Sequence, residues 1–282
     1  MASVSKLTKL VPALAIAVGF GAANPSQAAD LLMDPPIMEA PEVVETSQGG
    51  WYLRGDITYD FHQANGATYY PAAEMFTDLR VDDSFDIGLG IGYQVTNNFR
   101  VDLTGEYVFA ADWTGTSVDT NSICPDTYDA YGNYVDFNTV PGSCTGVNTA
   151  RMSMFKVMGN AYYDIGHFAG FTPYIGAGIG GAYVMYDDFL QTDTSRDQCC
   201  GNQIGDEIVR SHVGRDSWRF AYAFHAGMSY DINHKVKFDL GYSYTDIGHG
   251  AIANYIDSDK PQAYDEGFTD HVIRAGLRYQ IW

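Results

Sequence analysis

Few residues that could perform catalysis or bind a metal occur at spacings known for such chemistry. The seven histidines show no HxxxH or HExxH spacing, and the sequence contains no CxxC pair and no phosphate-binding loop. His249 lies near Asp246 and His271 follows Asp270, but closeness along the chain does not create a catalytic geometry. We therefore predict that the protein is not an enzyme and has no catalytic residues, no metal ligands and no cofactor.

The four cysteines favour one disulfide bond. Cys124 and Cys144 lie in the same long predicted loop, which a bond between them would restrain. Cys199 and Cys200 are adjacent, and a bond between neighbouring cysteines is strained. Because four cysteines allow three pairings, we predict Cys124–Cys144, with pairs between the two cysteine-containing loops as the alternative.

Tyrosine and histidine side chains in predicted loops could bind iron. These residues are His62, Tyr69, Tyr70, His249, Tyr255 and Tyr264. Tyrosines are common in loops, so we rank a haem-binding surface protein as a secondary hypothesis.

A larger set of functional groups consists of charged side chains that recur at every second position of several segments. In residues 51–61, apolar side chains at odd positions alternate with polar ones such as Arg54 and Asp56. A period of two is typical of a β-strand, because successive side chains point to opposite faces. The pattern recurs in residues 85–95, 99–109, 154–163, 172–183, 218–230, 236–245 and 273–281, so we predict eight strands.

The two faces of these strands differ in a way that indicates a membrane barrel. The polar faces share charged residues that we expect to form a network in the lumen: Arg54, Asp56, Asp86, Arg100, Asp102, Glu106, Lys156, Arg219, Lys237, Asp239 and Arg278. The apolar faces begin or end with aromatic residues: Trp51, Phe61, Tyr93, Phe99, Phe109, Tyr163, Tyr183, Trp218, Tyr230, Tyr244 and Tyr279. A soluble β-sheet protein would explain the alternation, but aromatic residues at both ends match the two girdles of a membrane barrel.

Lipid offers no hydrogen bonds to an open sheet edge, so the sheet must close. We therefore predict an all-β fold, an eight-stranded antiparallel up-and-down transmembrane β-barrel.

Connection lengths predict the orientation of this barrel. Short connections at residues 96–98, 165–170 and 231–235 alternate with long ones at 62–83, 110–149, 185–216 and 246–267. Outer-membrane barrels have short periplasmic turns and long surface loops. Residues 110–149 contain five aspartates and no lysine or arginine, so we expect flexible acidic loops, with a Ca²⁺-bridged surface as the alternative. Sixteen Lys and Arg against 35 Asp and Glu make nucleic acid an unsuitable partner.

The N-terminal sequence predicts export. Residues 1–28 combine Lys6 and Lys9 with an apolar stretch and a small-x-small site, which is typical of a secretory signal peptide cleaved after Ala28 or Ala29. Residues 29–49 are acidic and contain three prolines, so we interpret them as a periplasmic leader outside the fold. Residues 50–282 then form the barrel, and export places the cysteines in an oxidising compartment.

Three segments resemble a known family. Residues 50–56 (GWYLRGD), 172–180 (TPYIGAGIG) and 274–279 (RAGLRY) are similar to the outer-membrane β-barrel family of alphaproteobacteria, which includes surface barrels of Brucella, Bartonella and rhizobia. The resemblance covers about residues 50–282 and implies a location in the cell outer membrane. Members of that family have structural, immunogenic, porin-like and haem-binding roles. Such chains end in an aromatic residue two positions after a tyrosine, whereas here Tyr279 lies three before Trp282.

An eight-stranded barrel is just wide enough for side chains to fill it, so we expect paired charges to plug the lumen and His225 to act as a polar filler. The predicted function is a structural and surface-interaction barrel with acidic extracellular loops. The expected partners are outer-membrane lipid and lipopolysaccharide, the barrel-assembly machinery, and a host or environmental surface ligand. A narrow porin-like pore or a haem-binding surface barrel is the alternative.

Overall fold

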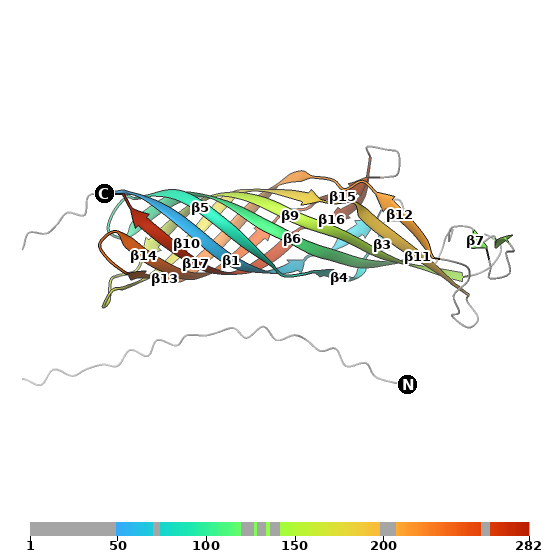
Figure 1. Cartoon of the computed structure of the whole chain (residues 1–282), viewed down its shortest axis with the longest axis horizontal. Helices are drawn as coiled ribbons and strands as arrows, with labels where there is room; N and C mark the ends of the chain where they lie inside the picture. Colours follow the sequence, from blue (N-terminus) through green and yellow to red (C-terminus); the bar gives the residue numbers. More distant parts are fainter. Residues whose placement is uncertain are drawn as a thin grey trace, which may run out of the picture. The chain divides into compact units, whose positions relative to one another are not determined.

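The computed structural model describes residues 49–69, 74–119, 127–128, 134–135, 142–197, 207–254 and 260–281. Eight of its strands form one antiparallel barrel: β1 (Trp51–Ala64), β5 (Ser84–Gln94), β6 (Phe99–Asp119), β9 (Gly142–Asp164), β10 (Phe171–Tyr186), β13 (Ser217–Asp231), β14 (Val236–Ile247) and β17 (Phe268–Gln280). The barrel closes because β17 pairs with β1 and β6 pairs with β9 (Figure 1). The predicted fold class is therefore confirmed. Within the described ranges, no helix has the length and apolarity needed to cross a membrane.

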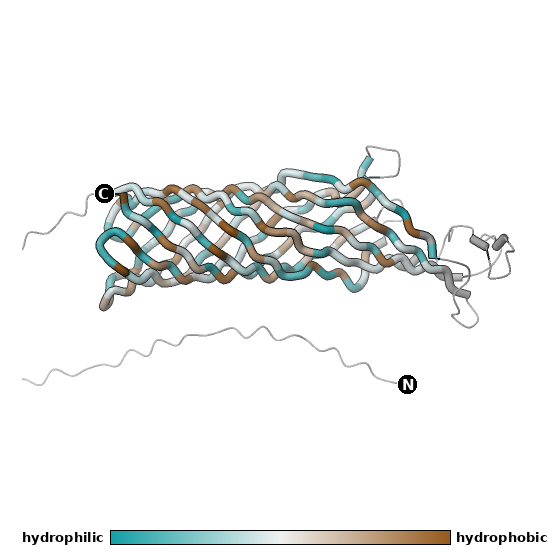
Figure 2. Tube along the Cα trace, in the orientation of Figure 1, coloured by the Kyte–Doolittle hydropathy of each residue, from teal (hydrophilic) through white to brown (hydrophobic). Residues whose placement is uncertain are grey.

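Side chains alternate between the two faces of the barrel wall as their sequence pattern predicts. Leu89, on the outward face of β5, is 74% exposed, whereas Arg54, on the inward face of β1, is 5% exposed. Figure 2 shows hydrophobic and hydrophilic residues alternating along the strands. The part of the barrel wall that contains Arg54 and Leu89 therefore has apolar side chains outside and charged side chains inside, which is the reverse of a water-soluble barrel.

The aromatic residues at the strand ends lie on the outward face, where most are exposed and Tyr93, Tyr183 and Tyr244 are half-buried. At one end of the barrel, the ring centroids of Trp51 and Tyr93 lie 5.2 Å apart. At the other end, those of Tyr183 and Trp218 lie 5.2 Å apart. The aromatic residues therefore border the outward apolar surface at both ends.

Three short turns connect the strands at the end that we call the turn end. Residues 95–98, 165–170 and 232–235 make these turns, and the first and last described residues also lie at this end. Thr96 Oγ1 accepts a hydrogen bond from the Phe99 amide at 3.0 Å, and Asn233 Oδ1 accepts one from the Val236 amide at 2.9 Å. Such side-chain bonds stabilise tight turns and fix the register of the hairpins.

The opposite end, the wing end, carries more β-structure than the sequence predicts. Its additional strands are β2 (Ala67–Tyr69), β3 (Glu74–Met75), β4 (Thr77–Val81), β7 (Thr127–Tyr128), β8 (Tyr134–Val135), β11 (Phe189–Asp197), β12 (Ile208–His212), β15 (Gly250–Asn254) and β16 (Pro261–Asp265). Strands β6 and β9 remain paired as far as Asp119 and Cys144. The described parts of the predicted long connections therefore contain strands that the sequence does not predict.

A β-bulge explains why this extension is hard to see in the sequence. The register of β6 against β9 shifts between Val108 and Ala111, so the inward positions of β6 change from even to odd numbers. Beyond the bulge, Trp113 faces inward and is buried, while Asp112 is exposed. A bulge adds one residue to a strand and thereby inverts its alternation. The wing end therefore has the apolar-inside pattern of a soluble protein.

The inward apolar side chains of the wing end form one cluster, which we call the apolar cap. Its members include Phe76, Trp113, Phe189, Ile252 and Phe268, all buried. The ring centroids of Trp113 lie 5.5 Å from those of Phe76 and 5.7 Å from those of Phe189. Burying a large apolar side chain contributes about 1.5–3 kcal/mol, so the cap is a substantial source of stability outside the lipid-facing wall.

Candidate functional site

Ion pairs and hydrogen bonds join the inward polar side chains into several groups, which we together call the ionic network, and the first group surrounds Arg54 of β1. Its Nε donates to Asp56 at 2.8 Å, and its Nη1 donates to Asp102 of β6 at 2.8 Å. Asn160 of β9 donates to the other oxygen of Asp102 at 2.8 Å. A buried charge is tolerated only when it is paired and hydrogen-bonded, and this group meets both conditions.

A second centre of the network surrounds Lys156 of β9, nearer the wing end. Its Nζ lies 3.0 Å from Asp60, 3.1 Å from Asp86 and 3.5 Å from Glu106. Glu106 also accepts a hydrogen bond from Arg274 of β17 at 2.7 Å. Five strands thus contribute charged side chains to one level of the lumen, because inward positions of neighbouring strands lie side by side.

Next to Lys156, His62 of β1 joins Asp270 of β17 and Ser84 of β5. One ring nitrogen, Nδ1, lies 2.7 Å from Asp270 Oδ1, and Nε2 lies 2.8 Å from Ser84 Oγ. The sequence prediction placed His62 in a loop as a ligand for haem iron. The structure instead places it inside the barrel, because β1 continues to Ala64.

Aromatic and ionic residues meet near the turn end. The guanidinium carbon of Arg100 lies 4.0 Å from the ring centre of Tyr162 and 4.7 Å from that of Tyr174, and Arg100 pairs with Asp164 at 3.2 Å. Arg278 donates to Asp239 at 3.0 Å. Stacking on aromatic faces adds to the charge pairing in holding these arginines.

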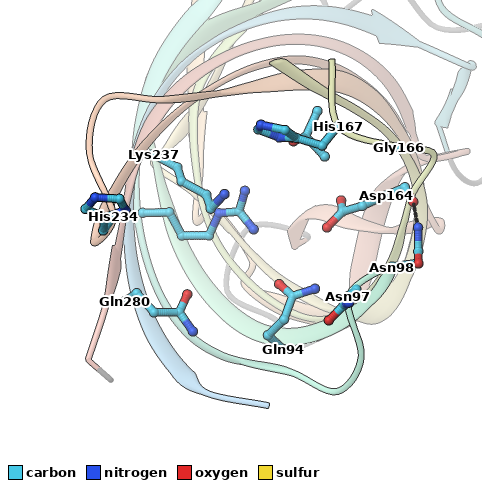
Figure 3. A pocket seen from close by; sticks show the side chains of 11 residues that line it. Gln94, Asn97, Asn98, Asp164, Gly166, His167, His234, Lys237 and Gln280 are labelled. Atoms are coloured by element: carbon cyan, nitrogen blue, oxygen red, sulfur yellow. Dashed lines mark hydrogen bonds between the residues drawn. The ribbon is translucent and has the colours of Figure 1, made fainter. Parts of the chain in front are cut away.

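A polar pocket of about 430 Å³ opens at the turn end (Figure 3). Its lining includes Gln94, Asp164, His167, Lys237 and Arg278. Lys237, which the sequence predicted to lie in the lumen network, is half-buried at this mouth and pairs with Asp231. The pocket is the entrance to the lumen, and the buried Arg100 and Asp239 lie deeper in the network.

The predicted network residues occupy three places. Most lie in the ionic network of the lumen, Lys237 lies at the pocket, and Arg219 lies below the apolar cap, where it pairs with Asp265 at 2.6 Å. Tyr186 also donates to Asp265, at 3.0 Å. Burial is the largest influence on Asp265 and raises the pKa of its carboxyl, while Arg219 opposes this shift.

Sequence reasoning missed several members of the network. The missed residues are Asp60, His62, Asp164, Asp265, Asp270 and Arg274. Asp60 and Arg274 lie on the inward faces of predicted strands, so alternation alone could have added them. Asp270 and Asp164 could have been found only by extending the strands past their predicted ends.

The remaining predicted site residues divide into described and undescribed ones. His225 is buried and its ring nitrogens lie 2.8 Å from Ser243 Oγ and 3.1 Å from Asn160 Oδ1. His249 and Tyr264 are exposed. Outside the described residues lie the signal and leader segments as far as residue 48 and also Cys124, Cys199, Cys200, Tyr70, Tyr255 and Trp282. For Cys144 and Tyr69 the structure describes only the strand, so the disulfide stays a prediction.

The wing end also presents a flat outward surface. Strands β4, β6, β9, β11 and β12 form a five-stranded sheet there, and a group of its outward positions carries uncharged, mostly β-branched residues, bordered by the exposed Arg80, Asp112 and Arg151. We call this surface the threonine face; it consists of Thr114, Thr116, Thr145, Val147, Thr149, Leu190, Thr192 and Val209. Val147 lies between Thr116 and Thr192 across the strands. Val209 is 64% exposed, so a large part of the face is open to solvent.

The inner side of this sheet contains His212, which is buried beside Phe189 with their ring centroids 6.1 Å apart. Burial lowers the pKa of His212, and the positive charge of Arg210 acts in the same direction. The wing end therefore holds an uncharged imidazole at neutral pH.

Comparison with known proteins agrees with the barrel geometry. Residues 13–280 match the family model described as outer membrane protein beta-barrel domain. An uncharacterized protein of Brucella suis biovar 1 is 34% identical over 283 residues, with 91% of this chain and 93% of that protein covered. A Rickettsia bellii protein named as a candidate adhesin is 22% identical over 252 residues, with 87% of this chain and 94% of that protein covered.

Solved structures similar to this chain include a surface protein and an outer membrane protein. The crystal structure of Neisserial surface protein A has a TM-score of 0.42 at 15% identity and covers 83% of this chain and 99% of its own. That of OprG from Pseudomonas aeruginosa has a TM-score of 0.45 at 16% identity and covers 82% of this chain and 96% of its own.

Proposed function

Because the chain belongs to the outer membrane protein beta-barrel family, we propose that it is a closed outer-membrane barrel whose wing end contacts a surface partner outside the cell. In this proposal the turn end faces the periplasm and the wing end faces the exterior, as in barrels with short periplasmic turns. The proposal assigns the protein no catalysis. Lipid and lipopolysaccharide surround the outward apolar wall.

One observation carries the proposal, namely the change from a polar to an apolar interior along the barrel axis. The lumen is lined by paired charges towards the turn end, whereas the inward positions at the wing end carry the apolar side chains of the cap together with buried polar residues such as Arg219, Asp265 and His212. Ions cross a low-dielectric apolar region only at high cost. Two successive fillings, one ionic and one apolar, therefore support a closed barrel rather than a porin-like pore.

The threonine face supports the second half of the proposal. Its cross-strand neighbours Thr116, Val147 and Thr192 are small, stiff and uncharged, so binding a partner would order few flexible side chains and bury no unpaired charge. β-Branched side chains lose little rotamer freedom in a sheet. The name of the Rickettsia bellii relative also fits a surface-contact role.

Adherence of cells that display the protein tests the surface-contact role. We expect Val147→Lys combined with Thr192→Lys to reduce binding to a cultured epithelial monolayer by about tenfold or more, which corresponds to about 1.4 kcal/mol or more. Buried at an interface, the new ammonium groups would lack partners. A matched control, Asn97→Lys with His234→Lys, adds two lysines at exposed positions of the turn end and should bind like the unmodified protein. Equal adherence of all three proteins would remove the threonine face from the proposal.

A further inference from the structure

Three side chains with metal-binding chemistry meet inside the barrel at the wing-end limit of the ionic network. Asp60 and His62 lie two positions apart on β1 and therefore face the lumen together. Asp270 of β17 pairs with His62 in the strand register. Each residue offers one ligand atom, and these atoms all lie within 4.8 Å of one another in three buried residues.

We propose that Asp60, His62 and Asp270 bind one divalent transition-metal ion inside the barrel. The site is separate from the threonine face, and it does not depend on the proposed contact with a surface partner. It would join β1 to β17, the two strands that close the barrel.

An unpartnered carboxylate oxygen supports the proposal. Asp270 is 0% exposed; its Oδ1 contacts His62, but its Oδ2 has no hydrogen-bond partner. The neighbouring Asp86 is also fully buried, and neither of its oxygens accepts a hydrogen bond, although one forms the ion pair with Lys156. Buried polar atoms are nearly always satisfied by protein, water or an ion, so these oxygens are available as ligands for a cation.

The charge balance at this level of the lumen leads to the same conclusion. The four buried carboxylates of Asp60, Asp86, Glu106 and Asp270 outnumber the bases at this level, which are Lys156, Arg274 and, when it is protonated, His62. The nearby Arg54 is already bonded to Asp56 and Asp102. Unbalanced buried negative charge is costly, and a divalent ion would neutralise it.

The donor set also indicates the kind of metal. One imidazole and two carboxylates suit Zn²⁺ or another first-row transition metal better than Ca²⁺, which takes oxygen ligands only. His62 already has the outer-shell partner that metal-bound histidines require, because Nε2 lies 2.8 Å from Ser84 Oγ while Nδ1 faces the carboxylate. Lys156 donates to Oδ2 of Asp60 at 3.0 Å and the Thr58 hydroxyl donates to Oδ1 at 3.3 Å, and each oxygen keeps a second lone pair for a metal ion.

Refolding gives a metal ion access to a site this deeply buried. The full mature chain would be refolded into detergent with ZnCl₂, MnCl₂ or CaCl₂, freed of excess metal by gel filtration, and analysed for metal content and unfolding temperature. Gel mobility of unboiled against boiled samples would verify the fold of each variant. We expect about one Zn²⁺ per chain, weaker retention of Mn²⁺ and no retention of Ca²⁺, following the preference of imidazole sites.

Variants separate this site from adventitious binding. His62→Gln and Asp270→Asn should each weaken Zn²⁺ binding at least tenfold, whereas His167→Gln, which removes an exposed histidine at the turn end, should have no effect. Lys156→Met removes a competing cation and should strengthen Zn²⁺ binding, an effect that a purely structural role would not produce.

A folded wild-type chain without bound Zn²⁺ would overturn the proposal, as would undiminished binding by folded His62→Gln. If neither ligand variant folds, the Co²⁺-refolded wild type decides the question. Visible d–d bands of a nitrogen–oxygen site support the proposal, and their absence contradicts it.

Discussion

Trp113 offers the sharpest test of how the wing end is stabilised. Its side chain is 0% exposed and is the largest fully buried one among the described residues, in contact with Phe76 and Phe189. Replacing a buried tryptophan with alanine typically costs about 3–5 kcal/mol, through lost apolar burial and the cavity left behind. Because the lipid-facing wall and the ionic network are unchanged in Trp113→Ala, we expect this cost to fall on the wing end alone.

Hydrogen exchange of the protein in lipid nanodiscs measures that effect segment by segment. A loss of about 3–5 kcal/mol corresponds to exchange roughly 150-fold to 4,000-fold faster in β4, β11 and the wing-end part of β6. The amides of β1 and β17 at the turn end should exchange as in the unmodified protein. Trp218→Ala, which removes an outward tryptophan that is 63% exposed, is the matched control and should leave the cap protected. Loss of protection along the whole barrel, or a change of less than tenfold in β4 and β11, would refute the reasoning.

Three further predictions concern the wall, the lumen and the wing. Arg54→Leu leaves two buried carboxylates without their partner and should destabilise the barrel by about 3–5 kcal/mol, measured by urea unfolding from lipid vesicles. Arg151→Leu, at an exposed ion pair, is the control and should cost at most about 1 kcal/mol. Equal costs for the two variants would contradict the buried network. Leu89→Arg places a charge on the lipid-facing wall and should cost about 2–4 kcal/mol in the same assay, and no cost would show that this face does not meet lipid. Burial lowers the pKa of His212, so the unfolded wing binds a proton more readily than the folded one, and stability should be lost as the pH falls below about 6.5. Proteolysis of the wing end should therefore accelerate between pH 8 and pH 5 in the unmodified protein but much less in His212→Phe, and equal acceleration in both would exclude this histidine as the cause.

Alternation along the chain was sufficient to predict the barrel wall. The pattern around Arg54 and Leu89 sets both the strands and their faces, because a residue in a barrel wall can face only lipid or lumen. Turn chemistry at Thr96 and Asn233 then marks the ends of hairpins. These features are local, so a single sequence displays them.

The wing end could not be predicted in the same way. The bulge between Val108 and Ala111 inverts the alternation of β6, so Trp113 occupies a position that the earlier register assigns to the outside. Strand β11 pairs with β12 on one side and with β9 on the other, outside the barrel closure, which no local pattern reveals. These contacts depend on the register between strands that are far apart in the sequence.

The candidate metal site shows that prediction of function from the sequence has the same limit. Asp60 and His62 are adjacent inward positions on one strand, but their third partner, Asp270, is 208 residues from His62 in the sequence. Only the closure of β1 against β17 brings them together. The prediction that the chain has no metal ligands was drawn from motif spacings, which do not test side chains that lie together only across the seam of a barrel.

Single-channel recording in planar lipid bilayers tests the closed barrel most directly. The ionic network and the apolar cap occupy successive levels of the lumen, so the refolded protein should insert without opening a stable pore. Trp113→Ala should also stay closed, because the network around Arg54 and Lys156 remains. A large and stable conductance from the unmodified protein would contradict the account.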